Sequence, residues 1–492
     1  MRFASLLEDN RLRLAISAIG LAFLGVLFLQ LLIDMSNQAF WRHDALTYLD
    51  SYRMKLTSEG RWVNYFFFPV LKATPPLLAW YMFVFVWLAF LTILFADLSK
   101  SWIFGVLCGL AVVMNGGFGS QAFWPSTMLL LPFILLATYL LVRTKLRYSV
   151  FATSSILLFG TISSAVFILP VLWWRQIRNW SFLKHAAMGF FWLFIFLLGT
   201  GIAFLSVKLM IGETLSPANW RYFNRPENTA DILQNLQHIW KVFNQQINVL
   251  VPKFYLVMVA LVGAVAWLVF TNINDKNKLA QAGPQFLKCL IWAFCMFVAI
   301  YLQAGLLGMH VSYRTAWIGL LGILMLAAYG MSQPKANAIP VAVIVAVICL
   351  TGFTGQSQIR ETHQKFEEVH RLTSEIKAEL EKANQVDFST FRQIVVLGEE
   401  GSGKWPIDQL SKVKLGNTGH GEGLNRGSVR WARSFQETPA QKVHVCIIDD
   451  GASKGFCYNR LPEEERLNNW PCGGVHLGFC RNVRTNKDAI IQ

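Results

Sequence analysis

Apolar runs recur along the first 354 residues of the chain. All but the shortest of nine such runs approach the ~20 residues that a helix needs to cross a bilayer. The runs lie at about 14–33, 77–96, 102–114, 127–142, 186–206, 254–271, 289–308, 315–330 and 338–353. The pattern predicts a polytopic α-helical membrane protein with about nine spans, of which the first is an uncleaved span with its N-terminus inside.

A further apolar segment, residues 149–172, has basic residues at both of its ends. They are Arg143, Lys145, Arg147, Arg175, Arg178 and Lys184. A single crossing would place one of these basic groups on the wrong side of the membrane. We therefore predict a re-entrant hairpin or two short helices, with an apex near residues 160–164.

This topology leaves two outer loops, 34–76 and 207–253, that are too long to be simple connections. In the first, Tyr48–Leu56 has the pattern of an amphipathic helix at the membrane interface. In the second, the pattern predicts a helix from about Thr229 to Leu250. A third outer segment, 115–126, is rich in glycine and is expected to be a flexible loop.

Composition divides the chain into two parts. Hydrophobic residues make up 54% and charged residues 15% of the whole, whereas a soluble domain has about 25% charged residues. Residues 1–354 hold 25 basic and 11 acidic residues, and residues 355–492 hold 19 and 18. Since the excess positive charge lies in the membrane part, it indicates oriented loops and anionic groups at the membrane surface rather than nucleic acid.

Residues 355–492 are expected to form an outer α/β domain. Residues 358–384 have a helical pattern, and 392–397 and 442–448 have the pattern of strands. Four cysteines without a CxxC pair favour two disulfides over a zinc site, with the pairing left open. They are Cys446, Cys457, Cys472 and Cys480.

The first outer loop carries the carboxylates that could do chemistry. It holds four of the eleven acids of the membrane part, namely Asp34, Asp44, Asp50 and Glu59. Asp44 lies between aromatic residues close to the expected membrane surface. A carboxylate there is ionised and could accept a proton from an acceptor hydroxyl. The alternatives are a solvated acid or one paired with Arg42 or Arg53.

Basic outer-loop residues could hold a phosphate group, because the guanidinium plane fits phosphate oxygens. They are Arg42, Arg53, Lys55, Arg61, Lys72, Arg221, Arg225 and Arg314. Arg314 stands out because it begins a span after a six-residue turn, and His310 precedes it in that turn. Interfacial anchoring accounts for most of the others.

Two other motifs carry less information. Gly398–Lys404 fits GxxxxGK, but Trp405 follows where a phosphate-binding loop needs Ser or Thr. The segment is therefore interpreted as a turn. No metal-ligand spacing is present, and no cofactor is predicted.

Three features of the chain resemble one family. They are the nine spans with a re-entrant segment, the large outer C-terminal domain, and an acidic first outer loop that closes in Ser58-Glu59-Gly60-Arg61-Trp62. The family is that of the phage-encoded serotype-converting glucosyltransferases, which modify the O-antigen of enteric bacteria and are similar to membrane glycosyltransferases of the GT-C type. Members show a second acid beside the first, and here His43 occupies that place. Either Asp44 or Asp50 is therefore the equivalent of the functional acid.

The resemblance implies an inverting transfer of glucose from a polyprenyl-phosphate-glucose donor to a lipid-linked O-antigen acceptor. The site would lie on the periplasmic face of the bacterial inner membrane, and a glucose-lipid synthase and a flippase would supply the donor. Asp44 is the first candidate for the base and Asp50 the second. Glu59, Arg61, Arg221, His310 and Arg314 would orient the loop or bind substrate, and Trp41, Trp124 and Trp220 would stack on sugar rings.

Two other classes remain open at this point. An O-antigen polymerase or ligase would use a lipid-diphosphate oligosaccharide as its donor. A transporter or flippase ranks last, because transporters are commonly built from two repeated halves and this sequence shows no repeat.

Overall fold

The computed structural model divides the chain into two compact units. One consists of residues 1–35, 53–74 and 78–359, and the other of residues 36–52, 75–77 and 360–492. The structure describes residues 2–36, 52–74, 76–122, 128–142, 147–216, 222–271, 276–311, 313–333, 337–360, 393–398, 429–433, 444–448 and 455–459.

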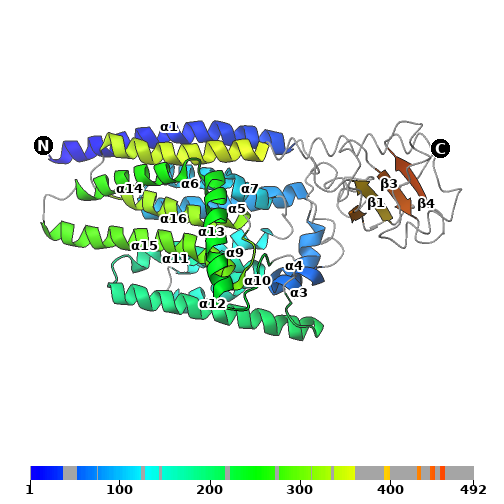
Figure 1. Ribbon diagram of the computed structural model, residues 1–492. Coiled ribbons are helices and arrows are strands. Elements are labelled where there is room, and N and C mark those ends of the chain that lie inside the picture. Colours follow the sequence, from blue (N-terminus) through cyan, green and yellow to red (C-terminus); the bar gives the residue numbers. More distant parts are fainter. Residues whose placement is uncertain are drawn as a thin grey trace. The chain divides into compact units, whose positions relative to one another are not determined.

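The first unit is helical (Figure 1). Its first half contains α1 (Arg2–Ser36), α3 (Arg53–Glu59), α4 (Trp62–Ala73), α5 (Pro76–Ser99), α6 (Trp102–Val113), α7 (Gly116–Ala122), α9 (Leu130–Val142) and α10 (Arg147–Thr161). The second half contains the 3-10 helix η1 (Ser163–Ile168), α11 (Leu169–Ile177), α12 (Phe182–Ile211), α13 (Thr229–Leu250), α14 (Phe254–Phe270), α15 (Lys276–Leu307), α16 (Tyr313–Met331) and a last helix, Ala338–Arg360.

Helix length and hydropathy make the chain a multi-pass membrane protein. Within the described residues, five stretches are long and apolar enough to cross a membrane, namely Arg11–Ser36, Leu77–Ser99, Phe182–Ile211, Ala282–Leu307 and Ala338–Arg360. Several shorter apolar helices accompany them. Each of the nine apolar runs overlaps a helix. The number of crossings and their orientation stay predictions.

The predicted hairpin at 149–172 is present as two short helices. α10 ends at Thr161, Ile162 has extended backbone angles (φ −149°, ψ 119°), and η1 and α11 follow. The chain then folds back, because the Trp173 ring lies 5.4 Å from that of Tyr148 and 4.6 Å from that of Phe151. The start of α10 and the end of α11 therefore lie at the same end of the helical unit.

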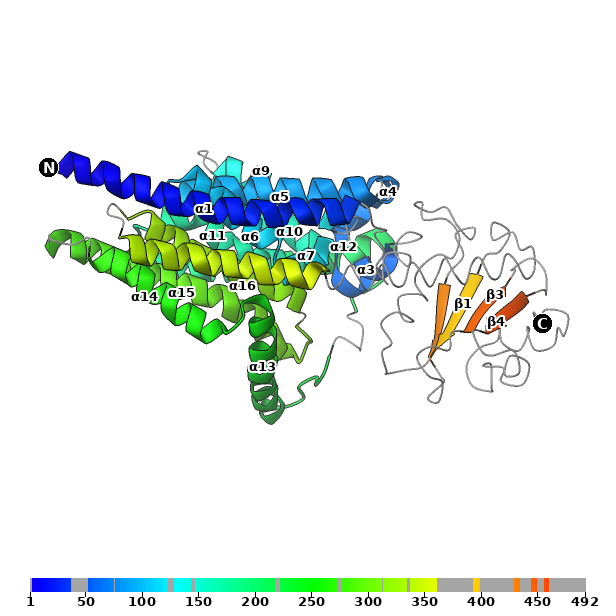
Figure 2. The same ribbon diagram turned by 90° about the horizontal axis from the view of Figure 1, so that it is seen from above.

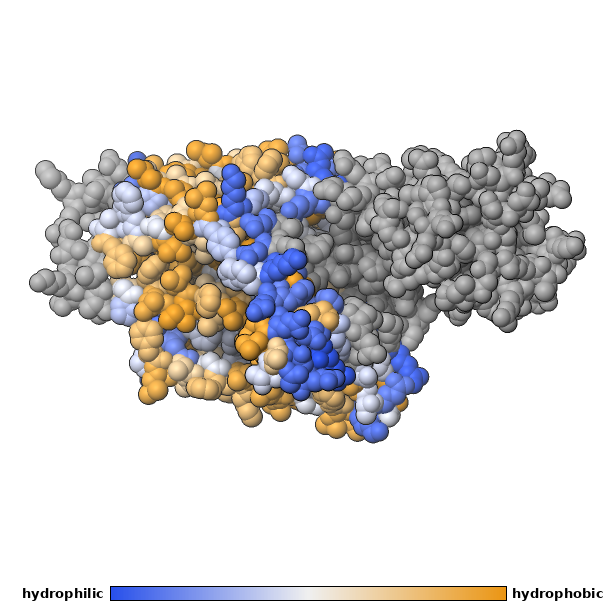
Figure 3. All heavy atoms as spheres, in the orientation of Figure 1, coloured by the Kyte–Doolittle hydropathy of each residue, from blue (hydrophilic) through white to orange (hydrophobic). Residues whose placement is uncertain are grey.

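α13 crosses the other helices instead of running along them, as the two views in Figures 1 and 2 show. The boundaries match the sequence-based expectation, and a capping box between Asn228 and Asp231 fixes its start. On the face shown in Figure 3, hydrophilic residues gather over α13 and the segment after α12, whereas the rest of the described helical surface is mostly hydrophobic.

Buried aromatic rings form the centre of the helical unit. Trp87, Phe118 and Trp317 contact one another with ring centroids 5.1–5.3 Å apart. α1 and the last helix pack side by side, with the Cys349 thiol 3.8 Å from the Gly20 carbonyl oxygen. The two ends of the membrane sequence thus share one interface.

One expectation for the outer segments needs correction. The glycine-rich segment at 115–126 is not a flexible loop in its described part: α7 is a buried helix, and side chains at Gly116 or Gly119 would collide with the last helix. In the first outer loop, α3 covers Arg53–Leu56 of the expected helix, residues 48–51 lie outside the described residues, and the apolar helix α4 follows. The small residues at 116–119 allow two helices to pack closely. From sequence alone, a glycine-rich segment that serves such packing looks the same as a glycine-rich loop.

In residues 361–492, the part that the structure describes is one four-stranded sheet. Its order is β2 (Val429–Arg433), β1 (Gln393–Gly398), β3 (His444–Ile448), β4 (Gly455–Asn459), with β1 and β2 parallel and the other pairs antiparallel. Cys446 and Cys457 are register partners in β3 and β4. Residues 361–392 and 399–428, including most of the GxxxxGK segment, lie outside the described residues, so the α/β domain and its disulfides stay predictions.

Candidate functional site

The step between α3 and α4 depends on a glycine. Gly60 has a φ of 67°, in the left-handed region that side chains disfavour. A Cβ atom at this position would also lie 2.8 Å from the Cβ of Ala203 in α12. Gly60 therefore lets the chain turn from α3 into α4 while its backbone touches α12.

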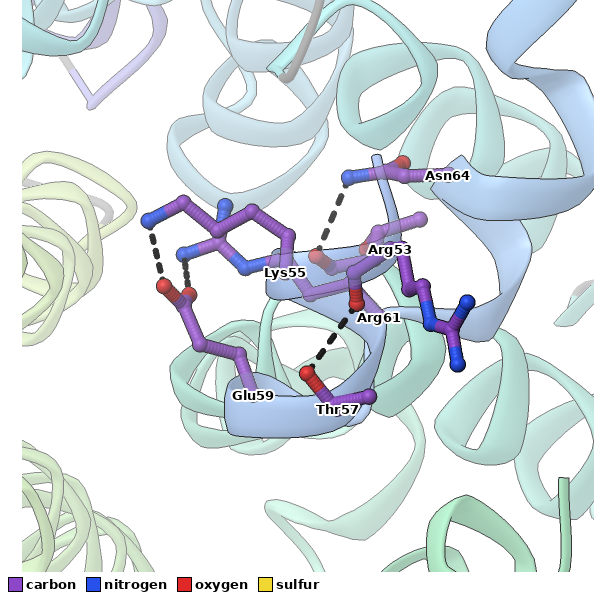
Figure 4. Close-up of polar contacts among 7 residues, drawn as sticks. Arg53, Lys55, Thr57, Glu59, Arg61 and Asn64 are labelled. Atoms are coloured by element: carbon purple, nitrogen blue, oxygen red, sulfur yellow. Dashed lines mark hydrogen bonds and ion pairs between the residues drawn. The ribbon is translucent and has the colours of Figure 1, made fainter. Parts of the chain in front are cut away.

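Glu59, the last residue of α3, is enclosed by two cations. Its carboxylate forms ion pairs with the Lys55 ammonium and the Arg61 guanidinium (Figure 4). The three side chains are only 6%, 11% and 14% exposed for Glu59, Lys55 and Arg61. At this burial the charges are weakly screened, so the pairs fix the side chains of the α3–α4 turn. We call Lys55, Glu59 and Arg61 the turn cluster.

α3 is also attached to the segment that follows α12. The Arg53 guanidinium pairs with the carboxylate of Glu213, and the Ser216 amide donates to the Thr57 carbonyl oxygen at 2.9 Å. The Arg53 and Glu213 side chains are 59% and 43% exposed, so solvent screens this pair. The backbone bond joins the first and second outer segments directly.

The apex of the α10–α11 hairpin supports the start of α4. The Asn64 side-chain amide donates to the carbonyl oxygen of Thr161 at 3.2 Å, and both side chains are buried. A Cβ at Gly160 would lie 2.5 Å from the Trp62 indole nitrogen and 2.7 Å from a Val63 methyl carbon. The Gly60-Arg61-Trp62 triplet therefore has three separate structural roles: a turn, an ion pair and a contact with the hairpin.

The pairing of Glu59 limits its chemistry. Both oxygens of the Glu59 carboxylate are engaged, one by Lys55 and the other by Arg61. The carboxylate therefore holds these two cations in place. Arg61 is thereby held at the end of the first segment, where a guanidinium could contact an anionic group.

Several predicted site residues cannot be placed. Asp44 and Asp50, the candidates for the base, lie outside the described residues, as do Trp41, Trp124, Trp220 and Arg221. Arg314 lies in the first turn of α16, and its side chain is not described. Of the predicted residues, the structure brings together Glu59 and Arg61.

His310 lies with the second outer segment. Its ring is 5.4 Å from that of Phe223, which lies 4.3 Å from the His238 ring of α13. The Phe223 amide also donates to the Gly308 carbonyl oxygen at 2.9 Å. His310 therefore belongs to the junction of the α15–α16 turn with α13.

Sequence reasoning missed three groups of this site. The Lys55–Glu59 pair has the i, i+4 spacing of helical ion pairs, a signal that could have identified it. No local signal marks Glu213 or Asn64, because their partners are 160 and 97 residues away. In the part of the chain that the structure describes, no group of three or more His, Cys, Asp or Glu side chains could hold a metal ion.

Comparisons with known proteins give no family for this chain. No family model, no curated protein and no solved structure matches it. The interpretation of the site therefore rests on its chemistry and on the sequence resemblance described above.

Proposed function

We propose that this protein transfers glucose from a polyprenyl-phosphate-glucose donor to a hydroxyl group of a lipid-linked O-antigen repeat. The main support is the turn cluster, a buried carboxylate that holds a lysine and an arginine at one end of a multi-pass helical unit. A lipid-linked sugar phosphate is positioned by the bilayer and needs cations where its phosphate leaves.

The reaction requires a base, an attacking hydroxyl and a stabilised leaving group. The acceptor oxygen attacks C1 of glucose from the side opposite to the donor phosphate. The new C–O bond forms as the bond between C1 and the phosphate oxygen breaks, which inverts the configuration. The acceptor proton passes to the base, and polyprenyl phosphate leaves with the bonding electrons.

We assign the roles as follows. Asp44 is the first candidate for the base, and Asp50 is the second. Arg61, positioned by Glu59, contacts the donor phosphate together with Arg221 and Arg314. The sugar rings stack on Trp41, Trp124 and Trp220, and His310 contacts substrate beside α13.

The proposal includes a location. The chain lies in a bacterial inner membrane with its N-terminus in the cytoplasm, and the turn cluster and residues 355–492 are periplasmic. The second unit would present the polymeric acceptor to the membrane site. Its cysteines would be oxidised in that compartment.

The test for the base compares substitutions of two acidic residues. Asp44→Asn should abolish glucose transfer, because an amide cannot accept the proton. Glu227→Gln, at an exposed position before α13, removes the same charge and should leave activity within about twofold, as surface substitutions do. The readout is the mass of lipopolysaccharide from cells that express each variant, scored for an added hexose. Membrane insertion and detergent gel filtration confirm that each variant folds.

The outcomes separate the candidates. If Asp44→Asn is fully active and Asp50→Asn is inactive, Asp50 is the base. Purified protein given polyprenyl-monophosphate glucose and acceptor should consume the donor. Transfer of a preassembled oligosaccharide from a lipid diphosphate would instead identify a polymerase or ligase, and failure to use either donor would overturn the proposal.

A further inference from the structure

A basic cavity lies at the far end of the same helices. Its volume is about 340 Å³, and it is bounded by the end of α5, the start of α6 and the end of α11. α5 has 24 residues and begins three residues after α4 ends, so its length of ~36 Å separates this cavity from the α4 end of the unit. The cavity therefore lies apart from the turn cluster.

Three cations and one carboxylate line the cavity. They are Lys100, Arg175, Arg178 and Asp97. Asp97 is engaged: it accepts a hydrogen bond from the Tyr139 hydroxyl at 2.5 Å, and the Arg175 guanidinium lies 3.6 Å from it. The cavity thus carries an excess of two positive charges over its single carboxylate.

The other two cations provide that excess. In the part of the chain that the structure describes, neither Lys100 nor Arg178 forms an ion pair. Arg178 lines the cavity, and its guanidinium therefore adds an unneutralised positive charge to the wall. A guanidinium in this position would be stabilised by an oxyanion in the cavity.

The backbone fixes where Lys100 lies. This residue joins α5 to α6 with a φ of 62°, in the left-handed region. Ser99 and Ser101, on either side of it, are tied into the turn by the Ser99 hydroxyl, which bonds to the Phe95 carbonyl oxygen at 2.6 Å and to the Ser101 amide at 3.3 Å. The lysine is thus held over the cavity on a defined turn.

The surroundings point to a lipid as the source of the oxyanion. The cavity opens where the apolar helix α5 ends, which is the depth of lipid headgroups. Trp102 lines it with a side chain that is 65% exposed, and an exposed tryptophan is typical of the membrane–water interface. Basic pockets between membrane helices bind anionic headgroups in this position.

We propose that this cavity binds the phosphate group of an anionic lipid, with Arg178 and Lys100 as its main contacts. Arg178 supplies the planar donors that match two phosphate oxygens. Lys100 supplies a second charge from the facing helix turn. Arg175 remains paired with Asp97, which fixes the wall of the cavity. The inference uses only this end of the helical unit and does not depend on the proposed transfer reaction.

The test measures lipid binding by the purified full-length protein in detergent. Titration with dioleoyl-phosphatidylglycerol, followed by native mass spectrometry, should give tighter binding than dioleoyl-phosphatidylcholine. Lys100→Ala with Arg178→Ala should weaken phosphatidylglycerol binding by about 30-fold, about fivefold for each cation removed. The matched control is Arg11→Ala with Lys184→Ala, which removes the same two residue types outside the cavity and should change binding by less than about twofold.

A second variant keeps the test decisive if the double variant does not fold. Lys100→Gly removes the charge at a position whose positive φ suits glycine, and it should weaken phosphatidylglycerol binding by about fivefold. Equal phosphatidylglycerol binding by wild type and these variants would overturn the proposal. Binding of inorganic phosphate without preference for phosphatidylglycerol over phosphatidylcholine would assign the cavity to a free anion and also overturn it.

Discussion

The two charged groups at opposite ends of the helical unit use the same residue types in different ways. In the turn cluster, the Glu59 carboxylate is 6% exposed and is enclosed by Lys55 and Arg61. At the far cavity, Asp97 is 23% exposed and pairs with an Arg175 side chain that is 56% exposed. In the turn cluster, both cations pair with the buried carboxylate. At the far cavity, Lys100 and Arg178 line the cavity without an ion pair among the described residues. The two groups therefore differ in burial and in the ratio of cations to acids, which is two to one in the turn cluster and three to one at the cavity.

The scarcity of acids in the membrane part supports this distinction. Two described acids outside both groups also have identifiable structural roles. Asp231 completes the capping box of α13, and Glu213 pairs with Arg53. Each of these carboxylates neutralises or orients a particular neighbour, so removing one should have a local and predictable effect.

The largest expected effect is that of Glu59→Gln. Removing one partner of a buried ion pair leaves the other charges poorly compensated, and we expect a loss of about 3 kcal/mol in the free energy of unfolding. Denaturant unfolding in detergent micelles measures this loss, and hexose addition to lipopolysaccharide measures the expected loss of activity. If this variant is as stable as the wild type, the ion pairs of Glu59 do not stabilise the fold. The turn cluster would then not differ in this respect from the group at the far cavity.

A smaller effect is expected for Gly160→Ala at the hairpin apex. Its new methyl group would lie within 2.7 Å of Trp62 and Val63, which costs about 1–3 kcal/mol and displaces the start of α4. Gly201→Ala in α12 is the matched control, because no atom lies within 4 Å of the added Cβ. The thermal midpoint in detergent should fall for the first variant and not for the second. Equal midpoints would mean that the hairpin does not support the turn cluster.

The smallest effect is expected for Glu213→Gln. Its ion pair with Arg53 is exposed, and such pairs contribute at most about 1 kcal/mol. The unfolding free energy and glucose transfer should both stay close to wild type. A loss as large as that of Glu59→Gln would indicate that the Arg53 pair, and not burial, determines the rigidity of the first segment.

Sequence predicted the helical unit better than the site. The helices are predicted from local signals in the sequence. These signals are the apolar runs, the basic residues on both sides of 149–172, and the pattern of Thr229–Leu250. The sequence predicts a loop where α7 forms a helix, since the glycines of α7 act through contact with a helix more than 200 residues away. The sequence does not predict α4, because this helix lies inside the segment 34–76, which is interpreted as a loop.

The site was predicted in part. Glu59 and Arg61 were singled out from the Gly60-Arg61-Trp62 step, and the structure pairs them. The bond from Asn64 to Thr161 and the pair of Arg53 with Glu213 join segments that are distant in sequence. A single sequence carries no record of such contacts, because they depend on how the helices pack.

The hairpin of α10 and α11 has a consequence for how the protein could vary. The chain enters and leaves this segment at the same end of the unit. The hairpin therefore adds no net crossing, and the direction of each later helix does not depend on it. Shortening or replacing residues 147–177 would therefore preserve the sidedness of everything downstream. What would be lost is the surface on which Trp62 and Asn64 rest.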